Sequence, residues 1–169
     1  YQANISVLNQ FYFIFNKWIT ESKCSNIINL GDDGGNVCTI LSSLFENKIS
    51  FFHCSSSFEC AKKMIELNEI KNFNISFKLD DINIFEKENE NIILFINPGR
   101  KGLSKEEINF IKSSKINYVI YMACNEKAFL KDLNLIIRYK IKEMVSILNM
   151  PVINKYQYLY FLYSETVSN

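Results

Sequence analysis

The sequence has few of the residues that interrupt regular structure, with only two prolines and five glycines among 169 residues. It contains no run near the roughly 18 apolar residues that a membrane-spanning helix needs, and no signal-peptide pattern opens it. Hydrophobic residues make up 48% of the chain and charged residues 22%, as in ordinary globular proteins. We therefore expect a single domain over residues 1–169 without long linkers or membrane contact. The start at Tyr1 rather than methionine suggests a piece, or a reduced form, of a longer protein.

An excess of charge of one sign is also missing, because the net charge is only +1. Free-standing nucleic-acid binders are usually strongly basic on one face. Near-neutrality argues against this domain supplying most of an RNA affinity by itself, but it leaves RNA open as a substrate.

The five cysteines form no CxxC pair. His53, Cys54 and Cys60 lack the ligand spacing of a closed zinc site, so no metal is expected. The pattern favours reduced thiols in an intracellular compartment, with cytosol and organelle both open.

Helical and strand patterns alternate along the chain. Helices are predicted over 5–20, 37–45, 56–67, 104–112 and around Phe129, Leu133 and Ile136, and strands over 26–30, 49–54, 75–79, 91–97, 117–123, 139–148 and 156–163. Capping boxes open two helices, at Ser56 with Glu59 and at Ser104 with Glu107. Alternating strands and helices predict a parallel sheet covered on both faces, whereas the short loop at Pro151 predicts a closing antiparallel pair. The expected fold is α/β, the doubly wound, Rossmann-like sheet of a class I methyltransferase, with strand order 3-2-1-4-5-7-6 and the last strand antiparallel.

Two polar segments follow directly after buried strands. Residues 97–103 read NPGRKGL, and residues 121–125 read YMACN. Both lie where a parallel strand is expected to end, and that edge of an open α/β sheet is where ligands bind. Cys124 at this edge is a candidate nucleophile, although a small buried residue at a strand end is the plainer interpretation.

These segments resemble motifs of the S-adenosylmethionine-dependent RNA uridine C5-methyltransferases, which make 5-methyluridine in tRNA and rRNA. The similarity is to their C-terminal catalytic domain and runs essentially end to end. The matching segments are 1–4 (family FFQxN), 29–35 (DLYCGxG), 67–72 (LNGIKN), Asp81 (GD), 97–103 (DPPRKGL), 121–125 (YVSCNP) and 149–151 (DMFP). RKGL and the Cys-Asn pair, in this order, are the most specific of them.

The resemblance implies a covalent mechanism. The thiolate at Cys124 would add to carbon 6 of uracil, so that carbon 5 can take the methyl group, and a base would then remove the carbon 5 proton. The family's glutamate base falls on Gln157, whose amide cannot accept a proton at neutral pH, and Glu165 lies too far along the chain to replace it. Arg100 is suited to an RNA phosphate.

The resemblance also implies that S-adenosylmethionine is the cofactor. The corresponding positions are Gln2, Asn29, Gly31, Gly35, His53, Asp81 and Asn97. Two departures put its binding in question. No carboxylate stands at the end of the second strand for the ribose hydroxyls, where His53 offers one hydrogen bond or is merely structural. Asn97 replaces an aspartate. In the same segment Gly99 replaces a proline, which predicts a looser loop for positioning the substrate.

Three hypotheses remain open from the sequence. The chain is an RNA uridine C5-methyltransferase with impaired activity, or a catalytically silent relative that binds RNA within a larger ribonucleoprotein assembly of other proteins. An unrelated small-molecule methyltransferase would leave RKGL and the Cys-Asn pair unexplained. In the first two, Cys124 should lie at the sheet edge close to Arg100 and Gln157.

Overall fold

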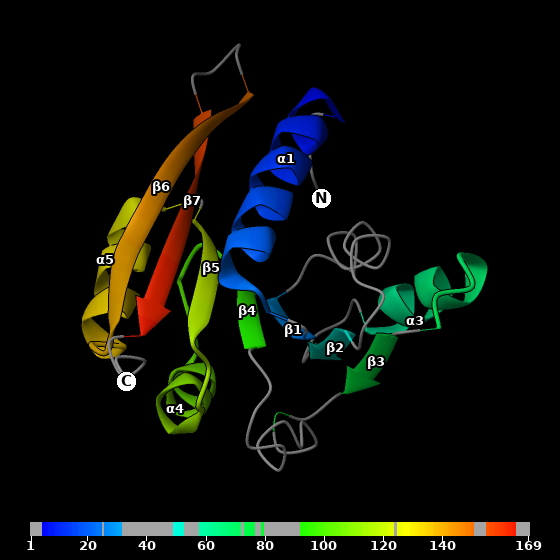
Figure 1. Ribbon diagram of the computed structural model, residues 1–169, viewed down its shortest axis with the longest axis horizontal. Helices are drawn as coiled ribbons and strands as arrows, with labels where there is room; N and C mark the ends of the chain where they lie inside the picture. The colour runs from blue at the N-terminus through cyan, green and yellow to red at the C-terminus, as the bar shows by residue number, and fades with distance from the viewer. Residues whose placement is uncertain are drawn as a thin grey trace.

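The computed structural model describes most of the chain. The described residues are 5–24, 26–31, 49–52, 58–71, 73–76, 79, 92–123, 125–150 and 155–164. Within them, seven strands form one sheet in the order β3-β2-β1-β4-β5-β7-β6 (Figure 1). The elements are α1 (Ile5–Ser22), β1 (Asn26–Gly31), β2 (Ile49–Phe52), α3 (Phe58–Leu67), β3 (Phe73–Ser76), β4 (Ile92–Asn97), α4 (Lys105–Ser113), β5 (Tyr118–Ala123), α5 (Glu126–Leu135), β6 (Tyr139–Met150) and β7 (Lys155–Ser164).

The sheet is parallel except at β7. Strands β3, β2, β1, β4 and β5 pair in parallel, and β7 runs antiparallel to both β5 and β6. The predicted α/β class is confirmed, and the strand order is the one that the resemblance implies.

The bounds differ from the sequence-based prediction mainly at β3. This strand covers Phe73–Ser76 rather than 75–79, because its register follows the short strand β2, with Ile49 opposite Phe73. The predicted helix over 37–45, strand residues 53 and 54, and the Ser56 capping box lie outside the described residues. The capping box of Ser104 and Glu107 is confirmed at the start of α4.

Both faces of the sheet are covered by helices. On one face α1 contributes Phe11, Phe15 and Trp18 to a buried cluster with inward-facing strand residues such as Phe95 and Phe161. On the other face α4 and α5 pack on the alternate strand residues, which form a second cluster around Tyr121. Alternation of side chains along each strand divides the core in this way. None of the described helices is long and apolar enough to cross a membrane.

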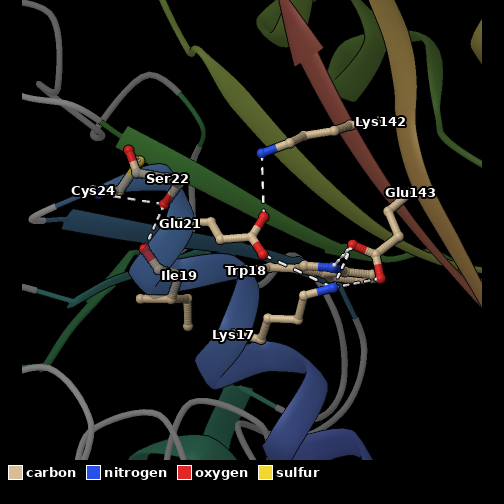
Figure 2. A network of polar contacts seen from close by, with 8 residues as sticks. All are labelled: Lys17, Trp18, Ile19, Glu21, Ser22, Cys24, Lys142 and Glu143. Atoms are coloured by element: carbon tan, nitrogen blue, oxygen red, sulfur yellow. Dashed lines mark hydrogen bonds and ion pairs between the residues drawn. The ribbon is translucent and has the colours of Figure 1, made fainter.

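Helix α1 is tied across the sheet to the edge strand β6 (Figure 2). Lys17 Nζ lies 2.8 Å from both carboxylate oxygens of Glu143, and the Trp18 indole N–H donates to Glu143 Oε2 at 2.9 Å. Lys142 reaches Glu21 at 3.2 Å. The hydrogen bond from Lys17, with a second from Trp18, lowers the pKa of Glu143. These contacts hold α1 and β6 together over the core.

Candidate functional site

The ends of β1, β4 and β5 lie together at one edge of the sheet. Gly31, the last residue of β1, pairs with Asn97, the last residue of β4, and Ile96 pairs with Tyr121 of β5. The carboxyl ends of parallel strands thus meet where the two polar segments begin.

A hydrogen bond joins these two polar segments. The Asn125 side-chain amide donates to the backbone carbonyl of Arg100 at 3.3 Å, although the two residues are far apart in sequence. Asn125 also caps α5, because its side-chain oxygen accepts from the Lys127 N–H at 3.1 Å. Cys124 lies outside the described residues, but its neighbours are described: Ala123 ends β5, and Asn125 contacts the Arg100 loop.

Strand β7 brings a third motif to the same edge. Ala123 of β5 pairs with Tyr158 of β7. Gln157, which precedes Tyr158, pairs with Ile147 of β6. Only the backbone of Gln157 is described, so its closeness to Cys124 stays a prediction. The pairing of the residues next to each of them supports that prediction.

The loop between β4 and α4 forms a closed turn. The N–H of Gly102 donates to the carbonyl of Gly99 at 3.0 Å. The side chains of Arg100 and Lys101 are exposed on this turn, where they are accessible to a polyanion. The turn leads into the capped first residues of α4.

A buried carboxylate that the sequence-based interpretation missed holds the same loop. Asp132 of α5 is fully buried, and its Oδ2 accepts hydrogen bonds from the Leu103 N–H at 2.7 Å and from the Tyr121 hydroxyl at 2.6 Å. The available signal was its position: it lies between Phe129 and Ile136 on the apolar stripe of the predicted helix. An acidic residue on such a stripe has to find a buried partner.

Aromatic rings support this arrangement from below. Phe129 packs edge-on against Tyr121, with ring centroids 5.0 Å apart, and is stacked on Tyr160 of β7 at 3.6 Å. Burial raises the pKa of Tyr160, and the negative charge of Glu126 adds to this effect. These ring contacts pack helix α5 against β5 and β7, next to the segments that form the site.

Few of the proposed cofactor positions are described. Asn29 is buried within β1, Gly31 ends that strand and Asn97 is partly buried beside it. Gln2, Gly35, His53 and Asp81 lie outside the described residues. The neutral amide of Asn97 can both donate and accept hydrogen bonds, so this position keeps a hydrogen-bond acceptor that a polar cofactor could use. No described cluster of His, Cys, Asp and Glu residues could hold a metal ion.

Comparison with known proteins finds relatives among RNA methyltransferases. The chain is 23% identical over 147 residues to a 23S rRNA (uracil(747)-C(5))-methyltransferase RlmC from Xenorhabdus nematophila, covering 85% of this chain and 38% of the relative. It is 23% identical to the enzyme of the same name from Haemophilus influenzae, covering 99% of this chain and 45% of that one. The chain therefore spans less than half the length of these relatives. No protein-family model matches it.

A solved structure shows the same fold. The Pyrococcus abyssi tRNA (uracil-54, C5)-methyltransferase, in complex with S-adenosyl-L-homocysteine, superimposes with a TM-score of 0.78 at 16% identity, covering 96% of this chain and 39% of that one. The fold is thus that of the class I methyltransferases, and the curated relatives confirm that the chain resembles the RNA uracil-C5-methyltransferases over nearly its whole length.

Proposed function

We propose that this chain carries the catalytic part of an RNA uridine C5-methyltransferase, with tRNA or rRNA as substrate and a slow final step. One observation carries the proposal: the hydrogen bond from Asn125 to the Arg100 carbonyl joins the Cys-Asn segment to the RKGL loop at the carboxyl edge of the sheet. The relatives, which are named as 23S rRNA uracil-C5-methyltransferases, support the choice of RNA and of carbon 5.

In this proposal Cys124 is the nucleophile. Its thiolate adds to carbon 6 of the target uracil, and the electron pair released toward carbon 5 makes that carbon reactive. S-adenosylmethionine supplies the methyl group when it is bound, with Gly31 and Asn97 among the residues that would hold it. Loss of the carbon 5 proton then expels the cysteine and restores the aromatic pyrimidine.

The proposed roles of the other site residues follow from their chemistry. Arg100 and Lys101 are exposed on the loop and suit RNA phosphates. Gln157 occupies the position of the base and cannot take the carbon 5 proton, so a covalent RNA adduct should persist. A reduced thiol is needed for this chemistry, so the proposal implies a reducing compartment.

The test uses unmodified tRNA and rRNA transcripts with methyl-labelled S-adenosylmethionine. We expect label in a protein–RNA adduct that survives denaturation, and little free methylated RNA. Restoring the base in Gln157→Glu should speed release of methylated RNA by about 100-fold or more, since a positioned general base contributes factors of that size. Cys124→Ala is the control and should form no adduct.

The alternative is a catalytically silent relative that binds RNA within a larger assembly. The side chains of Gln157 and Asn97 favour this alternative, because they replace the glutamate base and the aspartate of the resembled motifs. Binding of the transcripts with neither an adduct nor methylated RNA, in both the wild-type chain and Gln157→Glu, would support this alternative and refute catalysis.

A further inference from the structure

The buried carboxylate of Asp132 ties together three separate parts of the site. Its Oδ2 accepts from the Leu103 N–H on the loop and from the Tyr121 hydroxyl on β5, while Asp132 itself belongs to α5. Both contacts are short, as expected when the acceptor is a carboxylate. A single oxygen atom therefore connects the RKGL loop, the strand before the Cys-Asn segment and the helix after it.

A carboxylate at position 132 is not expected to be the most stabilising side chain there. The second oxygen, Oδ1, is buried and meets no hydrogen-bond donor among the described residues. A buried carboxylate with one unsatisfied oxygen is costly compared with an apolar side chain of similar size. Its presence on an otherwise apolar stripe indicates a role in positioning rather than in stability alone.

The loop is shaped to receive the carboxylate. Gly102 has a φ of +83°, and a Cβ at this residue would lie 2.5 Å from Oδ2 of Asp132. A side chain at position 102 would therefore be strained by the backbone conformation and would crowd the carboxylate. Arg100 lies two residues before Gly102, and its backbone carbonyl accepts a hydrogen bond from the Asn125 side chain. The loop is therefore fixed at two points.

We propose that Asp132 is a positioning residue for the RNA-facing loop of residues 98–104. It fixes Leu103 and Gly102 so that Arg100 stays beside the Cys-Asn segment. This supplies the rigidity that the resembled motif obtains from a proline where this chain has Gly99. The proposal rests on the proposed function for its RNA readout, whereas its structural part can be tested without RNA.

The experiment compares Asp132→Leu, Asp132→Asn and Tyr121→Phe with the wild-type full chain. The first readout is amide hydrogen exchange at Leu103 by NMR, in the absence of RNA. The second is affinity for an unmodified tRNA transcript and, separately, for S-adenosylmethionine. Arg138→Met is the matched control, because Arg138 bonds the backbone at the opposite end of α4.

Asp132→Leu should speed exchange at Leu103 by about tenfold or more, as expected for loss of a hydrogen bond to a charged group. It should weaken RNA binding by a similar factor while leaving S-adenosylmethionine affinity within about twofold. Asp132→Asn keeps an acceptor oxygen and should fall between it and the wild type. Arg138→Met should lower overall stability without selective exchange at Leu103 or a selective loss of RNA affinity.

If Asp132→Leu fails to fold, Asp132→Asn and Tyr121→Phe decide the question by the same readouts. Unchanged exchange at Leu103 in both would overturn the proposal. So would faster exchange accompanied by unaltered RNA affinity, since the carboxylate would then be structural only. A wild-type chain that binds no RNA would refute the proposed function, and with it the RNA-positioning role, even where Leu103 exchange still responds to Asp132.

Discussion

A charged side chain from a later part of the chain lies at each end of helix α4. At one end it contacts the helix itself, and at the other it contacts the loop before the helix. At its C-terminal end Arg138 donates to the carbonyls of Ile111 at 2.7 Å and Lys112 at 3.4 Å. A cation at this position satisfies the last carbonyls and complements the helix dipole. Arg138 therefore stabilises the helix itself.

At the N-terminal end the helix needs no such help. Ser104 and Glu107 already cap its first turn, with reciprocal hydrogen bonds of 3.2 Å and 2.7 Å. The carboxylate of Asp132 instead bonds the residue before the cap, Leu103. Arg138 thus stabilises the helix, whereas Asp132 fixes a loop at the site.

Substituting Gly102 should have the largest effect on the N-terminal end. Gly102→Ala places a side chain at positive φ and against the Asp132 carboxylate, so we expect a loss of about 3 kcal/mol in the free energy of unfolding. Urea denaturation followed by circular dichroism measures it. A stability equal to that of the wild type would mean that the loop and the carboxylate do not fit as described.

Substituting Arg138 tests the C-terminal end. Arg138→Met removes the donors to the last turn of α4 and should cost about 2 kcal/mol, since hydrogen bonds from a charged group are lost. The same denaturation series checks this value. The comparison fails if Arg138→Met also weakens RNA binding selectively, because both ends of the helix would then act on the site.

The C-terminal end should also respond to alkaline pH through Tyr139. Its hydroxyl donates to the Ile116 carbonyl at 2.8 Å and accepts from Arg138 at 2.7 Å. Burial raises the pKa of this hydroxyl, so its contribution is complete below the unfolded pKa near about 10 and is lost as pH rises through the folded pKa.

Denaturation of the wild type and Tyr139→Phe across pH 8–11, a range set about the ordinary tyrosine value, measures this contribution. The variant should be less stable by about 1 kcal/mol at pH 8. The difference in the free energy of unfolding between the wild type and the variant should narrow above the pKa of tyrosine in the unfolded chain. A gap that widens with pH would contradict the assigned direction of the shift.

The smallest expected change is a gain in stability at Gly99. This glycine lacks a positive φ, and a Cβ there would meet nothing within 4 Å. Gly99→Ala should therefore raise the free energy of unfolding by about 0.5 kcal/mol, by restricting the unfolded chain. A loss of stability would show that glycine is required at both positions of the turn.

Sequence patterns predicted the fold well because strands and helices alternate with clear periodicity. They also predicted the sheet edge, since Asn97 and Ala123 end two buried strands. They did not predict Asp132, because its partners, the Leu103 amide and the Tyr121 hydroxyl, are brought to it only by tertiary packing. The sequence also predicted a loose loop at Gly99, because the hydrogen bonds that close this turn cannot be seen in the sequence.

The most direct test of the central claim is incubation with S-adenosylmethionine and RNA that contains 5-fluorouridine. Fluorine at carbon 5 cannot be lost as a proton, so an attacking cysteine stays attached whether or not a base is present. We expect a denaturation-resistant adduct that peptide mass spectrometry maps to Cys124 and that Cys124→Ala abolishes. RNA binding without an adduct, or an adduct at another cysteine, would contradict the proposed site.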